Sequence, residues 1–299
     1  MDQIIDNALL KQLDEAIKLY IDDDIQCDES KVAVISLLVS YHSRMNDINF
    51  LINNHRLNSA NVLMRVAFET YVYLKYIFEK NNRMKNRAKA YYFHDFQKFS
   101  YYLQHLDQTS ITTTDELIAD LNKSKNKKVL GPHKNVNNYF NDMRAKFRKC
   151  FVIKDQKLDF QLLKDSDKFK KCKIDSWKWY NDDGKTLDFL HLAIRLNLID
   201  EYAALYAPTS DDIHSDGLQH QLQFSRNQIT VQESFDPLTL VFFRGSILEL
   251  IQTLGKYIHS SQNRRKVTQR LQKARTIYLA RHSLHLLKKT TDPKKNQWL

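Results

Sequence analysis

Residues 59–79, SANVLMRVAFETYVYLKYIFE, form the stretch on which the fold prediction depends. Apolar side chains recur there at helical spacing around most of the circumference, which predicts a central helix packed by neighbours on several sides. Arg65 and Glu69 interrupt this apolar pattern. Because they lie four residues apart, they can bond to each other or point together into a shared pocket. The stretch therefore predicts where a site lies, but not which reaction it performs.

The composition predicts an all-α fold made of a single multi-helix domain with a basic, helical C-terminal extension. Five glycines and four prolines in 299 residues are too few for a sheet-rich fold with many tight turns. The chain also lacks the glycine-rich phosphate loops and the nucleophile elbow of common enzyme classes. We expect the domain to span residues 1–262, with a charged insert at 122–175, and the extension to span residues 263–299.

Hydrophobic periodicity and turn residues predict the individual elements. Pro237 stands at the favoured first position of a strongly apolar helix, and residues 223–234 have the β-branched composition of an extended connection. The segment 185–198 has an apolar stripe formed by Leu187, Leu190, Ile194 and Leu198. Further helices are expected at residues 3–23, 29–54, 83–106 and 136–151.

Cysteine usage and the absence of apolar spans indicate the compartment. Cys27, Cys150 and Cys172 are odd in number and unclustered, which is typical of reduced thiols inside a cell. The first residues carry acids where a signal peptide needs basic residues, and no apolar run approaches the roughly 18 residues that span a bilayer. We expect a cytoplasmic protein that does not bind membranes and uses no cofactor or metal.

Several sequence blocks in residues 34–226 resemble the bacterial family known as domain of unknown function 5677 (DUF5677). Their order and spacing are more informative than any single block. The blocks are Ala60, Leu63, Arg65 and Glu69; Arg87 to Tyr91; Ser176 and Trp177; a helix like residues 187–198; and Tyr206 followed by Ser210 and His214. Pro208 departs from the family pattern, and the basic residues from Asn263 onward lie outside it. The resemblance implies a helical fold and no agreed activity.

The matched residues suggest one candidate catalytic site, formed by Arg65, Glu69, Tyr206, Ser210 and His214. In this hypothesis His214 supplies an acid or base. Arg65 holds a phosphate or carboxylate, and Glu69 orients one of them. The alternative is a buried ion pair that, with a hydrogen-bonded serine and histidine, only fixes the packing of helices.

A second candidate site comes from a likeness to small helical ribonucleases of the higher-eukaryote and prokaryote nucleotide-binding (HEPN) group. These enzymes use an arginine and a histidine a few residues apart on one helix. Arg87 and His94 fit this loose pattern, as do Arg275 and His282. A seven-residue step is close to two helical turns, so each pair would share a face. Chance matches are expected, because the chain has 46 basic residues and eleven histidines.

The C-terminal extension holds most of the net charge of +11. From Asn263 to Leu299 there are eleven Lys and Arg residues but one acid, Asp292. Apolar residues among these cations suit a helix that docks by one face and displays charge on the other. Its predicted nucleic-acid-binding residues are Arg264, Arg265, Lys266, Arg270, Lys273, Arg275 and Arg281.

Two functions follow as hypotheses. The first is a bacterial effector or toxin-like protein that cleaves RNA or another phosphodiester by metal-independent acid-base chemistry, in stress response or phage defence. The second is a noncatalytic helical adaptor whose basic extension binds nucleic acid or an acidic protein. RNA is favoured over DNA as the partner. A homodimer is a further expectation, since helical nucleases often complete their site across a two-fold interface.

Overall fold

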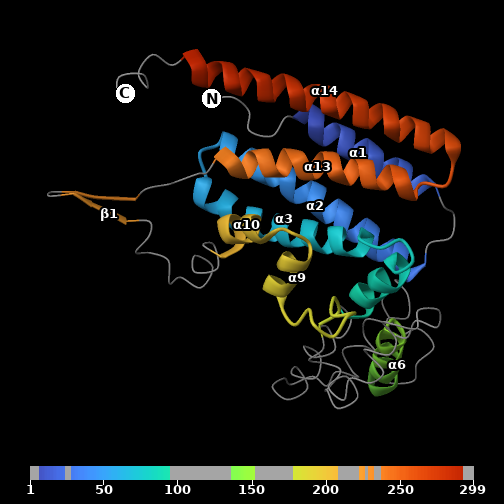
Figure 1. Ribbon diagram of the computed structural model, residues 1–299. Helices are drawn as coiled ribbons and strands as arrows, with labels where there is room; N and C mark the ends of the chain where they lie inside the picture. The colour runs from blue at the N-terminus through green and yellow to red at the C-terminus, as the bar shows by residue number, and fades with distance from the viewer. Residues whose placement is uncertain are drawn as a thin grey trace, which may run out of the picture. The chain divides into compact units, whose positions relative to one another are not determined.

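The computed structural model describes residues 7–23, 28–94, 136–151, 178–207, 222–225, 228–231 and 237–291 (Figure 1). In these ranges the chain is mainly helical, which confirms the all-α prediction. Contacts divide it into two compact units. The first contains Met1–Gln26, Ile35–Leu74 and Leu198–Leu299, and the second contains Cys27–Val34 and Lys75–Asn197. The predicted domain border after residue 262 stays a prediction; this division follows other boundaries.

Three helices of the first unit pack against one another: α1 (Asn7–Asp22), α13 (Pro237–Tyr257) and α14 (Ser261–Thr291). Figure 1 shows α14 running alongside α1 and α13. Leu9, Leu13 and Ala16 of α1 are buried at helical spacing, as expected for an amphipathic helix. The proline at the start of α13 and the helix over the basic extension are both confirmed.

The helices α2 (Glu29–Asn53) and α3 (Leu57–Phe78) lie within a few residues of their predicted limits. In the first unit, α3 meets α13 through aromatic rings. The ring centroids of Phe68 and Phe242 are 5.6 Å apart, and those of Tyr71 and Phe242 are 5.4 Å apart. The expectation that neighbours surround α3 on most sides is only partly met. Its face with Arg65 and Glu69 is half-buried rather than enclosed.

The second unit is centred on aromatic residues. Trp179 is buried and meets the edges of Tyr76 and Tyr91, with centroid distances of 5.5 and 5.0 Å. Tyr91 belongs to a helical segment over residues 84–94, the described part of the helix predicted at 83–106. The predicted helix after residue 136 is α6 (Val136–Lys149), whose Phe147 packs against Phe151 at 5.0 Å.

The helix α9 (Phe189–Arg195) corrects the predicted apolar stripe. Leu187, Leu190 and Ile194 are 54%, 36% and 51% exposed, whereas Leu192 is fully buried. Arg195 explains the change of face. Its guanidinium bonds to carboxylates in the interior of the second unit, and this turns the side of α9 that carries Leu192 inward. Leu198, the fourth predicted residue, is buried as expected.

The remaining described elements belong to the first unit. They are the single turn α10 (Ile199–Glu201), the π-helical segment η2 (Tyr202–Tyr206), and the strands β1 (Leu222–Ser225) and β2 (Gln228–Val231). The strands pair antiparallel, with Leu222 opposite Val231, where the sequence predicted an extended connection. Among the described helices, none combines the length and apolar character that crossing a membrane requires.

Candidate functional site

The first candidate site is the half-buried face of α3 that carries Arg65 and Glu69. The Arg65 guanidinium lies 4.2 Å from the centre of the Tyr206 ring, a cation–π contact. Tyr206 in turn stacks on Tyr202, with ring centroids 5.1 Å apart and an interplanar angle of 26°. The π-helical winding of η2 places these two tyrosines, four residues apart, in one stack. The structure thus brings together two residues that are 141 positions apart, Arg65 and Tyr206.

Glu69 has a local role on the same face. Its Oε1 accepts a hydrogen bond of 2.6 Å from the hydroxyl of Tyr73, one turn further along α3. This contact orients the carboxylate along the helix. Ser210 and His214 lie outside the described residues, so their predicted approach to Arg65 stays a prediction. Of the five predicted members of this site, the structure places Arg65, Glu69 and Tyr206.

Two tyrosines of the first unit, Tyr41 of α2 and Tyr71 of α3, form hydrogen bonds to side chains of α13. The Tyr71 hydroxyl donates a 2.5 Å hydrogen bond to Glu249 of α13, and the Tyr41 hydroxyl lies 2.6 Å from the Ser246 hydroxyl. Burial raises the pKa of Tyr71, and the Glu249 charge raises it further. Burial also raises the pKa of Tyr41. Both phenols therefore stay protonated and serve as hydrogen-bond donors rather than as bases.

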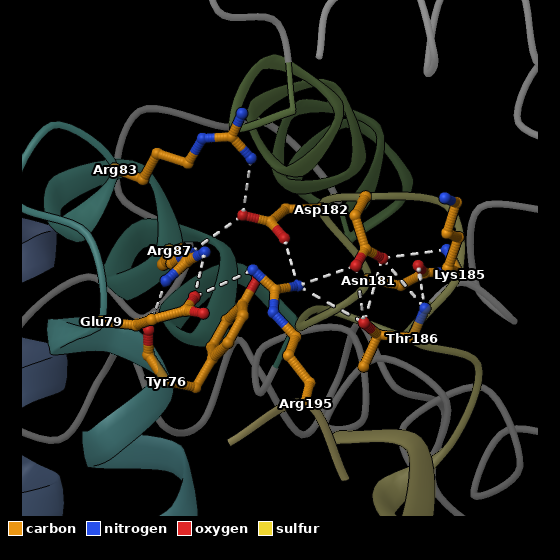
Figure 2. A network of polar contacts seen from close by, with 10 residues as sticks. Tyr76, Glu79, Arg83, Arg87, Asn181, Asp182, Lys185, Thr186 and Arg195 are labelled. Carbon is orange, nitrogen blue, oxygen red and sulfur yellow. Dashed lines mark hydrogen bonds and ion pairs between the residues drawn. The ribbon is translucent and has the colours of Figure 1, made fainter. Parts of the chain in front are cut away.

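The second unit contains a group of charges that sequence reasoning largely missed, the Asp182 cluster (Figure 2). Three arginines converge on the Asp182 carboxylate. Arg83 Nη1 and Arg87 Nε lie 3.1 and 2.9 Å from its Oδ2, and Arg195 Nη1 lies 2.8 Å from its Oδ1. Arg83 and Arg87 are each only 2% exposed, and Asp182 is 6% exposed. The carboxylate is held in one orientation by three charge-assisted bonds.

Glu79 and Asp183 complete the Asp182 cluster. Glu79 Oε2 lies 2.8 Å from Arg87 Nη2 and 2.9 Å from Arg195 Nη2, and Asp183 Oδ2 lies 3.2 Å from Arg195 Nη1. The three guanidinium groups are thus matched by three carboxylates. A balanced cluster of this kind fixes the chain segments that contribute to it and offers little net attraction to a free anion.

The Tyr76 ring lies between two of these arginines. The guanidinium carbons of Arg87 and Arg195 are 4.1 and 5.1 Å from its centroid, and Arg87 Nη1 donates to the Tyr76 carbonyl at 2.6 Å. Burial raises the pKa of Tyr76 well above its ordinary value, and the Asp182 charge raises it further. The ring therefore serves as a neutral platform for two cations.

Burial and charge act in opposite directions on Asp182. Burial by itself would raise its pKa, but the charges of Arg87 and Arg195 outweigh that effect, and the pKa falls to about 2. Burial also opposes the charge of Arg195, yet the Asp182 carboxylate raises the pKa of that guanidinium. Each charge is thus stabilised by its partners and depends on them.

Arg87 and His94, the predicted catalytic pair, have different surroundings. Arg87 is bonded within the Asp182 cluster, whereas the His94 ring lies 6.1 Å from that of Phe147 in α6. The contacts of Arg87 hold its guanidinium in place within the second unit. A catalytic role for the pair stays a prediction. Sequence reasoning identified Arg87 but not Asp182, Glu79, Arg83 or Arg195; the signal in the chain was the acidic pair Asp182-Asp183 directly after the buried Trp179 and Tyr180.

The third candidate is the basic helix α14. Val267 and Ala274, seven residues apart, are buried where α14 packs against α1 and α13. Five predicted binding residues are exposed, namely Arg264, Arg265, Lys266, Lys273 and Arg275. The sequence of α14 contains no Asp or Glu to neutralise them. The docked helix with a charged outer side agrees with the predicted arrangement.

Three of the predicted cations, Arg264, Arg270 and Arg281, need separate description. Arg270 Nη1 lies 2.7 Å from Glu15 of α1, so its charge is matched. Arg264 donates two hydrogen bonds, of 3.2 and 2.9 Å, to the Ile258 carbonyl just after α13, a favourable place for a cation. Arg281 lies in the part of α14 where only the backbone is described.

Asp23, next to the end of α1, fixes the start of α14. Its carboxylate accepts hydrogen bonds from the backbone N–H groups of His259 and Ser260 at 2.5 and 2.9 Å. The Ser260 hydroxyl accepts one from the N–H of Asn263 at 3.3 Å, as an N-cap does. A carboxylate at this end also suits the helix dipole.

Comparison with known proteins identifies one family. A sequence model described as a family of unknown function, DUF5677, matches residues 31–229. No curated protein and no solved structure matches the chain. The matched range includes the Asp182 cluster and the Arg65–Tyr206 contact. It ends before α13 and α14.

Proposed function

Because the chain belongs to DUF5677, a family of unknown function, we propose its function from its own geometry: α14 binds the phosphate backbone of nucleic acid. The single observation behind this proposal is the set of exposed cations on a helix without acids, formed by Arg265, Lys266, Lys273 and Arg275. Cations presented together in this way neutralise phosphates and release condensed counterions, which supplies most of the affinity of nonspecific binding.

The contrast with the Asp182 cluster supports the choice of α14. The arginines around Asp182 are bonded to carboxylates and buried, so a phosphate would have to displace an internal partner. The four cations of α14 face solvent. An incoming phosphate therefore meets little competition and little desolvation of buried groups.

Salt dependence of binding tests this proposal. We would measure the dissociation constant for a labelled RNA and a labelled DNA at several salt concentrations by fluorescence anisotropy. Neutralising the four cations (R265Q/K266Q/K273Q/R275Q) should weaken binding. The slope of log affinity against log salt concentration should become less steep by about 2.8 to 3.6, at roughly 0.7 to 0.9 per phosphate contact.

A matched control removes the same charge elsewhere. Lys11, Lys80, Lys178 and Lys185 are exposed and lie outside α14. The variant K11Q/K80Q/K178Q/K185Q should keep the slope of the native protein. Two outcomes would reject the proposal. One is an equal salt slope for the native chain, the α14 variant and the control variant; the other is no affinity of the native chain for nucleic acid at any salt concentration. The latter result would favour an acidic protein as the partner of α14.

A second function, cleavage of a phosphodiester, is supported by the contact between Arg65 and Tyr206. Tyr206 precedes Ser210 by four residues, so the contact agrees with the hypothesis that this part of the chain meets α3. Arg65 would hold the phosphate, and His214 would act as acid or base without a metal. The half-buried position of Arg65 and Glu69 leaves them partly accessible to a substrate.

Cleavage of labelled RNA tests this second function. Cleavage that is lost in H214A and R65A, and retained in H94A, would support the site on α3. If cleavage were lost only in H94A, the predicted Arg87–His94 pair would be the catalytic site. Melting curves of each variant separate loss of chemistry from loss of fold. Binding without any cleavage would leave phosphate-backbone binding as the function.

A further inference from the structure

The outer side of α14 has an ordered pattern of side chains. Residues at helical spacing form a central strip, which consists of Arg265, Gln269, Gln272 and Thr276, all exposed. The strip lies opposite the buried Val267 and Ala274. It is therefore the part of the helix that extends furthest from the packed core of its unit.

Two rows of cations border this strip. Lys266 and Lys273, seven residues apart, lie on one flank, and Arg264 and Arg275, eleven residues apart, lie on the other. All four are exposed. An α-helix with its side chains is about 10–12 Å across, so the two rows stand on opposite sides of a strip of mainly uncharged polar groups. A helix that only follows one strand needs cations on one flank.

The helix is held in place before any ligand arrives. A Cβ added to Gly255 of α13 would lie 3.4 Å from a methyl carbon of Val267, so α13 and α14 approach closely there. Asp23 fixes the first turn, and Arg264 is bonded to the Ile258 carbonyl. The rows and the strip are therefore fixed on a firmly seated helix.

From this pattern we propose that α14 lies in the major groove of double-stranded DNA, an inference that rests on the nucleic-acid binding proposed above. The major groove of B-form DNA is about 12 Å wide and accepts an α-helix, with one phosphate backbone on each side. Lys266 and Lys273 contact one backbone. Arg275 contacts the other, together with Nη1 of Arg264, the nitrogen that takes no part in the two bonds to the Ile258 carbonyl. In A-form RNA the major groove is deep and narrow, and side chains do not reach its base edges.

The chemistry of the central strip suits base edges. A glutamine amide both donates and accepts, and it pairs with N6 and N7 of adenine. Gln269 and Gln272 supply two such amides. The Thr276 hydroxyl donates to the Gln272 carbonyl at 3.1 Å, which leaves its oxygen as an acceptor facing the groove.

Comparing ligands tests the groove. Four labelled probes are used with the full chain at one salt concentration: a mixed-sequence DNA duplex of about two turns, an RNA duplex of the same sequence, and the two DNA single strands. Groove binding predicts an affinity for the DNA duplex at least about tenfold higher than for the other probes. Equal affinity for the DNA duplex and the single strands, or a preference for the RNA duplex, would reject binding in the DNA major groove. Either result would still agree with the proposed binding of the phosphate backbone.

Comparing variants tests the two rows and the strip. K266Q/K273Q should make the salt slope for duplex DNA less steep by about 2, and R275Q, which leaves the bonds of Arg264 to the Ile258 carbonyl intact, should make it less steep by about 1. Q269A/Q272A should keep the native slope but bind all sequences in a randomised duplex pool alike. If the salt slope changed when one row of cations was neutralised but not the other, α14 would not lie between two phosphate backbones, and the proposal of groove binding would be rejected. No binding of any probe by the native chain would instead reject the proposed function itself. Melting curves followed by circular dichroism check whether each variant is folded.

Discussion

Two groups of cations in this chain differ in what surrounds them. Around Asp182, Arg83 and Arg87 are buried and bonded to carboxylates. Along α14, Lys266 and Lys273 are exposed on a helix without acids. The same charge therefore contributes to fold in one place and is available to a ligand in the other. Burial and the nearest carboxylate distinguish these roles, not the residue type.

The largest expected effect comes from Asp182→Asn, which removes the central carboxylate and leaves three guanidinium groups without it. Breaking a buried ion pair from one side costs about 3–5 kcal/mol, and we expect a loss of that size in the free energy of unfolding by urea. Asp200→Asn, at an exposed carboxylate, is the control and should change little. A loss below about 1 kcal/mol in D182N would mean that the cluster does not stabilise the fold.

Acid should weaken the same cluster. The pKa of Asp182 lies at about 2 in the folded chain, below its ordinary value of 3.8. A carboxyl group with a lowered folded-state pKa stabilises the fold above its unfolded pKa, and this stability is lost as the pH falls. Between about pH 5 and pH 2 the cluster should lose about 2 kcal/mol of unfolding free energy. Urea titrations at each pH measure it, and an equal acid-dependent loss in D182N would contradict the assignment.

Neutralising α14 should affect stability far less. In R265Q/K266Q/K273Q/R275Q, four exposed charges are removed, and we expect the unfolding free energy to change by less than about 1 kcal/mol, since exposed charges contribute little. Urea denaturation of this variant beside D182N compares the two groups directly. If the unfolding free energy fell as much as in D182N, these cations would stabilise the fold. The two groups of cations would then not differ in role.

The smallest expected effect sharpens the contrast within α14. Arg270 is paired with Glu15 at 2.7 Å, and Glu15→Gln removes that partner. The half-buried Arg270 then carries an unmatched charge, so affinity for nucleic acid should rise about two- to threefold and the salt slope should steepen by less than about 1. Anisotropy titrations measure both. Weaker binding in E15Q would mean that the main effect of the Glu15–Arg270 ion pair is to position α14, not to neutralise the charge of Arg270.

The helices were largely predictable because their signals are local. Apolar spacing predicted α1, α2 and α3, and Pro237 marked the start of α13. The face of α9 was not predictable in this way. The apolar stripe of Leu187, Leu190 and Ile194 is exposed, because Arg195 bonds to Glu79 and Asp182 in the interior of the second unit. Periodicity does not contain that long-range information.

The candidate sites show the same limit. Arg65 and Tyr206 were expected together from their family-like blocks, and they are in contact. Arg87 was singled out for its distance from His94 along one helix, but its partners are Glu79 and Asp182. Asp182 is 95 residues from Arg87, and one acid among 35 offers no sign of a distant partner. The basic surface of α14 was predictable because an excess of charge can be counted along a single segment.

The seating of α14 on α1 and α13 has a thermodynamic consequence. Many basic tails are disordered and must fold when they bind, which spends part of their interaction energy on ordering the chain. The helix of α14, capped by Asp23 and anchored by Val267, is already formed. Association should then involve a small heat-capacity change and proceed rapidly, driven by the entropy of released ions rather than by coupled folding.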